Sequence, residues 1–167
     1  MDMSTLQDLY VDELRDLLHA ENQILKALPK MAKQASSPEL QKAFQDHLEE
    51  TQGHVERLNK IFEMMGEKPR TKKCKGMEGI IEEGKEIMSE AENDEIMDAG
   101  LIAAAQRVEH YEMAAYGTVR TYAKLLGDDK AAKLLQQTLD EEGNADKKLT
   151  ALAESGINIE AAQGAEA

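Results

Sequence analysis

The chain has 167 residues, the length of a single domain that can bury a sizeable core. Its apolar content is mostly Leu, Ile, Ala and Met, it has only three prolines, and strand-forming runs are missing, so the composition favours an all-α fold. The net charge of −13 disfavours binding to nucleic acid or to anionic membranes, and no apolar run approaches the roughly 20 residues of a membrane span.

Two long amphipathic helices are predicted in the first part of the chain. Apolar residues recur at helical spacing across residues 4–36, where Pro29 is expected to kink the helix or to end its regular part. Ser37 precedes a proline, as an N-cap often does, and the second helix is predicted over residues 38–65. Gly66 supplies the stop signal at its end.

A polar connection with one short helix follows. Residues 67–76 form a basic loop that contains the only cysteine, Cys74, so the chain cannot form an internal disulfide. This favours a reducing compartment, and since the N-terminus has no apolar signal core we expect a cytoplasmic protein. Neighbouring lysines would lower the pKa of the Cys74 thiol, although an incidental thiol is the favoured interpretation. A short helix is predicted over residues 77–91.

Two more long helices are predicted over residues 95–126 and 129–155. Asn93 is expected to cap the first of them, and the tail 156–167, which has no packing pattern, is predicted to be disordered. Short loops within each helix pair and a long connection between the pairs are typical of the one-crossover topology of ferritin-like four-helix bundles. We therefore predict one bundle domain over residues 1–155.

A weak internal repeat supports this topology. A shift of 91 residues (from 21 to 112) aligns Glu21 with Glu112 and Glu50 with Glu141, together with several apolar positions. Two helical hairpins, each with a carboxylate near the middle of both helices, are what a two-fold-symmetric metal site requires. The choice between Glu141 and Glu142 as the inward residue stays open.

Acidic residues interrupt the apolar stripes of the predicted helices. Glu21 lies in the stripe of the first long helix, Glu112 in that of the third and Glu142 in that of the fourth, each flanked by apolar residues. In the second helix, two histidines share a face with an acid at spacings of three and four. The candidate metal ligands are Glu21, His47, Glu50, His54, Glu109, Glu112, Glu142 and Asp146.

Carboxylates at matched depth in four helices need compensating charge. A buried carboxylate without a partner is costly, and four of them would repel one another unless cations or shared protons neutralise them. Carboxylates bridge pairs of divalent metal ions, and histidine supplies neutral nitrogen ligands. The pattern therefore predicts a site for two metal ions, expected to be iron, with manganese as the alternative.

The pattern departs from the Glu-x-x-His motif of di-iron and di-manganese bundles. The second helix has His-x-x-Glu and Glu-x-x-x-His instead, and the fourth long helix has no histidine. This departure favours an alternative, a structural or interaction protein on a degenerate scaffold. In that protein the carboxylates would share protons or hydrogen bonds with His47, His54 and Thr138.

Several segments resemble the YciF/YciE family of bacterial stress-induced proteins, and the resemblance covers nearly the whole chain. The segments are His47-Leu-Glu-Glu50-Thr, the run Ala103–Glu112 with its Glu-His-Tyr-Glu stretch, Tyr116-Gly-Thr, Leu139-Asp-Glu-Glu142 with Asp146, and the loop run Lys73–Gly84. The resemblance implies a ferritin-like fold, a helical homodimer, expression under osmotic or general stress, and a di-metal site related to that of rubrerythrins.

The resemblance also assigns individual positions. The acidic positions of the family match Glu21, Glu50, Glu109, Glu112 and Glu142, and its helix-two histidine matches His47. The candidate His54 rests on local spacing alone.

These observations lead to three functional hypotheses. The first is a metal-binding, redox-active domain whose reduced di-iron centre reacts with peroxide or dioxygen during stress. The second is the structural or interaction protein described above. The third, a ferritin-type storage cage, is disfavoured because nothing in the sequence points to a large closed shell.

Overall fold

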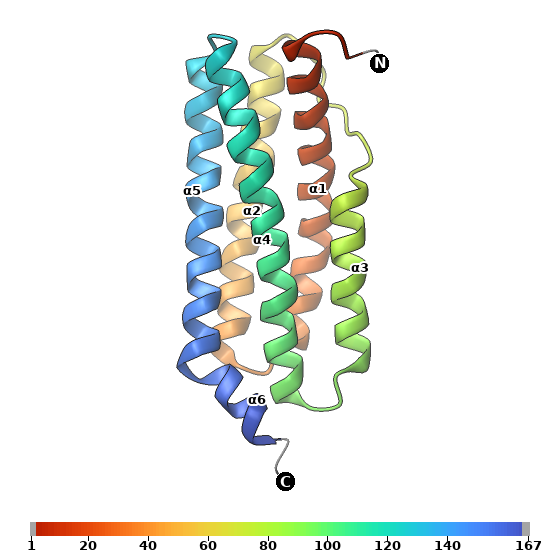
Figure 1. Ribbon diagram of the computed structural model, residues 1–167, viewed down its shortest axis with the longest axis vertical. Coiled ribbons are helices and arrows are strands. Elements are labelled where there is room, and N and C mark those ends of the chain that lie inside the picture. The colour runs from red at the N-terminus through yellow and green to blue at the C-terminus, as the bar shows by residue number, and fades with distance from the viewer. Residues whose placement is uncertain (1–2, 165–167) are drawn as a thin grey trace.

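The computed structural model describes residues 3–164, and this part of the chain is helical and contains no β-strand. Four long helices lie side by side, with a shorter helix on the outside and another across one end (Figure 1). The elements are α1 (Leu6–Gln34), α2 (Pro38–Met64), α3 (Lys75–Glu90), α4 (Asp94–Leu125), α5 (Asp129–Leu152), a π-helical turn (Ala153–Ile157) and α6 (Asn158–Gly164).

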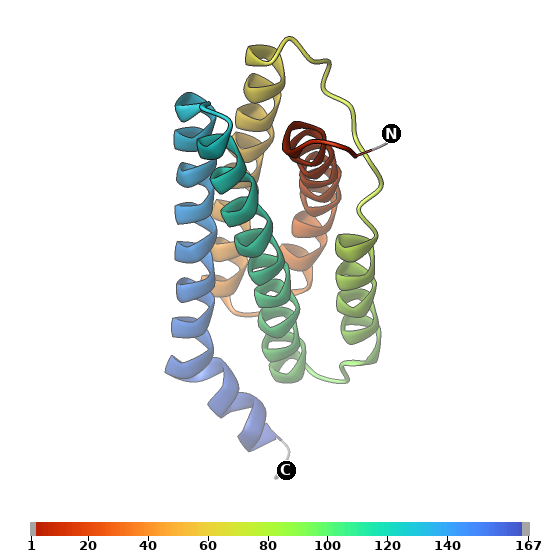
Figure 2. The same cartoon turned by 45° about the horizontal axis from the view of Figure 1, so that its top comes forward.

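The topology is the predicted one-crossover bundle. Helices α1 and α2 form one hairpin, α4 and α5 form the other, and α4 packs against α1 while α2 packs against α5. The connection between the hairpins runs the length of the bundle, and α3, which belongs to it, packs on the outside of α1 and α4 (Figure 2). The predicted all-α, ferritin-like arrangement with a short extra helix in the crossover is confirmed.

Local signals set the helix ends. Thr5 and Asp8 form a capping box, in which each backbone N–H donates to the side chain of the other residue (3.0 and 3.1 Å). Ser37 caps α2 as predicted, and Asn93 caps α4. Pro29 does not end the first helix, because α1 continues through it to Gln34 with the proline exposed.

The predicted tail differs in part from the structure. A π-helical turn follows α5, Ile157 is buried, and α6 contacts α4. Helical structure therefore continues to Gly164, and residues 165–167 of the predicted tail lie outside the described residues. The domain boundary at residue 155 stays a prediction.

The apolar core is divided into two clusters by a polar layer. One cluster contains Tyr10, Leu14 and Leu17 of α1, and the other contains Ile24 and Leu28 of the same helix. Between the two clusters, each of the four long helices places buried polar residues at about the same height. They are Glu21, His47, Thr51, His54, Glu109, Glu112, Thr138 and Glu142.

Asp98 ties the turn between α1 and α2 to α4. Its carboxylate is buried and accepts hydrogen bonds from the backbone N–H groups of Ser36 and Ser37 and from the Ser36 hydroxyl, each at 2.8 Å. Hydrogen bonds to a charged acceptor contribute about 1.5–3 kcal/mol. This contact fixes the register between the two hairpins.

Replacement of Asp98 by alanine should therefore lower the free energy of unfolding by about 2 kcal/mol, because three donors lose their acceptor. Urea unfolding measures this change. Asp140→Ala, which removes an exposed carboxylate that accepts only from Gln136, is the control and should stay within about 0.5 kcal/mol. A loss no larger than that of the control would contradict the assigned role of Asp98.

Candidate metal centre

The polar layer contains two groups of side chains whose oxygen and nitrogen atoms converge. In each group the candidate ligand atoms lie within 4.8 Å of one another, and every residue is buried. The first group is Glu21, His54, Glu112 and Glu142, and the second group is His47, Glu109 and Glu142. Glu142 belongs to both groups, so the two groups are adjacent and share one carboxylate.

The two oxygens of Glu142 face different histidines. Its Oε1 lies 2.9 Å from His54 Nδ1, and its Oε2 lies 3.7 Å from His47 Nε2. In the first group, His54 Nδ1 is also 3.2 Å from Glu21 Oε1. In the second, His47 Nε2 is 3.1 Å from Glu109 Oε1. This is the arrangement that a carboxylate bridging two metal ions requires.

Most of the converging atoms have no hydrogen-bond partner within the described chain. Both oxygens of Glu112 and of Glu142 are unpartnered, as are one oxygen each of Glu21 and Glu109. The ring nitrogens His47 Nε2 and His54 Nδ1 also lack a well-aligned hydrogen bond, although carboxylate oxygens lie within 3.2 Å of them. Buried polar atoms are normally satisfied. Oxygen and nitrogen atoms directed at a common centre are what a cation site provides, so this donor set fits a pair of divalent ions.

Without metal, burial and mutual repulsion of the carboxylates shift the pKa values of the polar layer. Burial and the neighbouring carboxylates Glu142 and Glu21 raise the pKa of Glu112 well above its ordinary value. Burial raises the pKa of Glu109 as well, and Glu142 adds to the rise. Burial lowers the pKa of His54, but Glu142 and Glu21 outweigh that effect and raise it to about 10. Protons therefore compensate the repulsion where cations are not bound.

Glu142 has the opposite shift. Burial alone would raise the pKa of its carboxyl, but the contacts with Glu109, His54 and His47 outweigh it and lower the pKa to about 2. The shared carboxylate therefore stays ionised between the two histidines.

Two outer carboxylates orient the histidines. His47 Nδ1 lies 3.1 Å from Glu50 Oε2, and His54 Nε2 lies 3.0 Å from Glu141 Oε2. Since an ionised carboxylate only accepts, each of these ring nitrogens donates its hydrogen outward. With a cation bound in place of the inner proton, the other nitrogen of each ring would turn a lone pair toward the shared centre. Outer carboxylates commonly fix the tautomer and orientation of metal-ligating histidines in this way.

Arg57 secures one of these outer carboxylates. It donates to both oxygens of Glu141 (2.7 and 2.8 Å) and to the Thr138 hydroxyl (3.0 Å). Although burial raises the pKa of Glu141, Arg57 outweighs this effect and lowers it. The sequence left Glu141 open as an alternative to Glu142, because the repeat pairs it with Glu50, and the structure places Glu142 inward and Glu141 outside it. Arg57 was not predicted.

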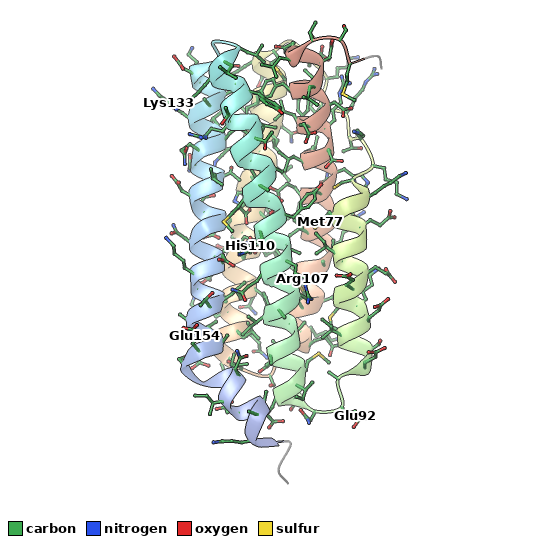
Figure 3. The ribbon with its side chains drawn as sticks, viewed as in Figure 1. Met77, Glu92, Arg107, His110, Lys133 and Glu154 are labelled. Carbon is green, nitrogen blue, oxygen red and sulfur yellow. The ribbon has the colours of Figure 1, made fainter. Side chains whose placement is uncertain are left out.

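The structure brings six of the eight candidate ligands together and leaves two outside both groups. Glu50 is exposed and lies beside the outer nitrogen of His47. Asp146 accepts from Gln106 (3.2 Å) and pairs with His110 Nε2 (3.2 Å). His110, labelled in Figure 3, lies at the surface of α4.

Tyr116 is a further residue that contacts the layer and was not among the predicted ligands. It is fully buried and its hydroxyl donates to Oε1 of Glu21. Burial, followed by the charges of Glu21 and Glu112, raises its pKa well above the ordinary value, so the phenol keeps its hydrogen. Its spacing of four residues from Glu112 was the signal that placed it on the same face.

The alternative in which neighbouring lysines lower the pKa of Cys74 is wrong. The thiol is buried and its sulfur lies 3.0 Å from the Tyr111 hydroxyl, so burial raises its pKa instead of lowering it. The neighbouring lysines are engaged elsewhere, since Lys72 pairs with Asp12 and Lys73 pairs with Glu78. Cys74 caps α3 through the Met77 N–H and anchors the crossover.

Two cavities reach the second group from opposite directions. A small one of about 90 Å³ between α2 and α5 is lined by His47, Glu50 and Glu109 among others. A larger one of about 240 Å³ between α1, α3 and α4 also ends at His47 and Glu109. Glu21, His54 and Glu112 of the first group line neither cavity.

None of the helices within residues 3–164 combines the length and the apolar character needed to cross a membrane.

A bundle of four long helices with one crossover and a mid-height layer of carboxylates and histidines defines a ferritin-like domain. Comparison with known families makes the assignment specific. The family model described as Domain of unknown function (DUF892) matches residues 5–162, and the chain belongs to this family.

Individual relatives agree with this assignment. The chain is 48% identical to Protein YciF of Escherichia coli (strain K12) over 162 residues, which is 96% of this chain and 98% of that protein. The crystal structure of the E. coli stress protein YciF superposes with a TM-score of 0.89, covering 93% of this chain and 99% of that one. The resemblance to a bacterial stress-protein family is thus confirmed.

Two other solved structures are similar. YcfI from Rhodopseudomonas palustris, provisionally described as a structural protein, has a TM-score of 0.88 at 43% identity and covers 89% of this chain and 95% of its own. A two-domain protein from Anabaena variabilis, with DJ-1/ThiJ/PfpI-like and ferritin-like domains, matches with a TM-score of 0.63 at 21% identity, over 93% of this chain and 38% of that one. This last likeness supports the fold alone.

Proposed function

We propose that this stress-protein homologue binds two divalent cations in the polar layer of its bundle, iron first and manganese as the alternative. The observation that carries the proposal is Glu142, which is fully buried and presents one oxygen to each group, while neither oxygen accepts a well-aligned hydrogen bond from the described residues. Two cations would satisfy these atoms and neutralise the layer.

The residues of the chain have distinct tasks in this proposal. Glu21, His54 and Glu112 would hold one ion, His47 and Glu109 would hold the other, and Glu142 would contribute to both. Glu50 and Glu141 keep the two imidazoles turned inward. Tyr116 fixes one oxygen of Glu21 and leaves the other directed at the centre.

The second group is the better place for reaction. It offers three residues where the first offers four, so an ion there has more room for a further ligand. The small cavity between α2 and α5 reaches His47 and Glu109 and is large enough for peroxide or dioxygen. When bound, a reduced iron pair would supply electrons to such an oxidant, which suits a protein of a stress family.

A structural role remains a second candidate. The raised pKa values of His54 and Glu112 show that protons can compensate the layer without metal. The description of the relative YcfI as a structural protein favours the same alternative. The homodimer implied by the family resemblance and the cytoplasmic location expected from the sequence belong to our proposal under either role.

Thermal melting with and without metal tests the proposal. A ligand that binds only the folded chain adds about 2.7 kcal/mol at a free concentration 100 times its Kd. For a chain of this size the Tm should then rise by about 5–10 °C when Fe(II), kept anaerobic, or Mn(II) replaces a chelator. The same Tm in chelator and in millimolar metal would reject the metal proposal and support the structural role.

A further inference from the structure

The larger cavity has an apolar body. It lies between α1, α3 and α4 and measures about 240 Å³. Its walls are aliphatic, with Ile24 and Leu28 from α1, Ile81 and Met88 from α3, and Val108 from α4. Burial of alkyl groups is the favourable interaction that such walls offer.

The two ends of this cavity differ in chemistry. The exposed residues of its lining are three lysines, Lys26, Lys30 and Lys85, so they mark the mouth. At the other end lie the buried His47 and Glu109, which belong to the second group of the candidate metal centre. A molecule in the cavity would therefore extend from a cationic mouth to the candidate reactive ion.

Two of the three lysines at the mouth form no ion pair within the described chain. Lys85 pairs with Glu82 at 3.0 Å, but Lys26 and Lys30 form no ion pair with any residue from 3 to 164. The two are four residues apart on α1 and so lie on the same face of the helix. Two unpaired lysines side by side on a protein with a net charge of −13 form a local site for an anion.

Small residues keep the cavity open where α3 meets α4. Gly84 packs on Ala104, and a Cβ added at Gly84 would come within 3.4 Å of the Ala104 Cβ. Both residues and Ala105 are buried and line the cavity. Larger side chains at these positions would occupy the space, so Ala105→Phe is a variant that should block it.

We propose that this cavity binds a medium-chain alkyl carboxylate, with the carboxylate at Lys26 and Lys30 and the alkyl chain directed toward His47 and Glu109. On α1 the lining runs from Gln23 to Met31, about 12 Å along the helix axis, so the cavity has room for an alkyl chain of several carbons. A role of the alkyl carboxylate as the substrate of the second group rests on the proposed function. Binding of the alkyl carboxylate to the cavity requires no metal.

Calorimetric titration of the full chain with decanoate, in the presence of a chelator, tests the ligand class. Saturable binding of one molecule per chain is expected, and 1-decanol should bind at least about 10-fold more weakly because it lacks the charge. Lys26→Glu with Lys30→Glu, and separately Ala105→Phe, should each weaken decanoate at least about 10-fold.

Lys130→Glu with Lys133→Glu is the matched control. Both control residues are exposed lysines of α5 without an ion pair in the described chain, and Lys133 lies on the side of the bundle away from α3 (Figure 3). The control changes the net charge equally and should alter affinity less than about two-fold. Absence of saturable binding, equal affinity for 1-decanol, or an equal loss in the control would overturn the proposal.

The orientation has its own readout. With Mn(II) bound, the terminal methyl resonance of decanoate should broaden more than the resonance next to the carboxylate, since the methyl lies nearer to His47 and Glu109. The reverse order would overturn the proposed orientation. Decanoate that binds with chelator but shows no broadening with Mn(II) would support the cavity as its site while contradicting the metal proposal.

Discussion

Replacement of Glu142 by alanine should abolish binding of both metal ions. Glu142 is the residue shared by the two groups, and its oxygens face His54 and His47 separately. Its loss removes one ligand from each ion and the bridge between them, so affinity should fall by more than the roughly 10–100-fold typical of outer residues. Metal content after gel filtration should drop from about two ions per chain to none.

Two further variants make this result specific. Glu109→Ala removes a ligand of the second group only and should leave about one ion per chain. Glu56→Ala removes an exposed carboxylate of α2 and should leave metal content unchanged. If Glu142→Ala kept as much metal as Glu56→Ala, the bridging role would be contradicted.

Replacement of Glu112 by alanine should abolish the ion of the first group and yet leave the metal-free protein as stable as before, or more stable. Glu112 is fully buried, and neither of its oxygens has a hydrogen-bond partner within the described chain. Without metal its carboxylate is destabilising, because Glu142, Glu21 and Glu109 repel it. Urea unfolding in chelator measures the change.

The size of this change in the free energy of unfolding also depends on pH. Because the pKa of Glu112 is raised in the folded state, the folded protein binds its proton more tightly than the unfolded chain does. The Glu112 carboxyl therefore destabilises the folded protein increasingly as pH rises above 4.5, the ordinary pKa of a glutamate. The stability gained in Glu112→Ala should grow over the same pH range. A hydrogen-bonded structural glutamate would instead lose about 1–3 kcal/mol on replacement. Such a loss, with metal binding intact, would contradict the ligand assignment.

The fold could be predicted because its signals are local. Apolar residues at helical spacing defined the four long helices, and Ser37 and Asn93 marked starts that the structure confirms. The crossover topology followed from one long connection between two short ones. The π-helical turn and α6 could not be predicted, because the burial of Ile157 in the turn and the contact of α6 with α4 depend on residues distant in sequence.

The candidate site could be predicted only in part. Glu21, Glu112 and Glu142 interrupt apolar stripes, so their inward direction follows from helical phase. Glu50 shares a face with His47, but the inward residue of that turn is its neighbour Thr51, which is fully buried. Neighbouring positions on a helix differ by about 100° in direction. Glu50 therefore points outward beside His47 instead of toward the centre of the bundle.

Cys74 shows the limit of charge patterns along the chain. Two lysines near it in sequence, Lys72 and Lys73, pair with Asp12 of α1 and with Glu78, and the buried thiol lies beside the Tyr111 hydroxyl. Its pKa is therefore set by burial and by residues distant in sequence.

Anomalous diffraction from crystals grown with Mn(II) or Fe(II) tests the central claim most directly. We expect two peaks in the polar layer, one among Glu21, His54 and Glu112 and one beside His47 and Glu109, with Glu142 between them. A map with no peak in the layer, or with metal only at surface carboxylates such as Asp46, would contradict the proposed metal centre.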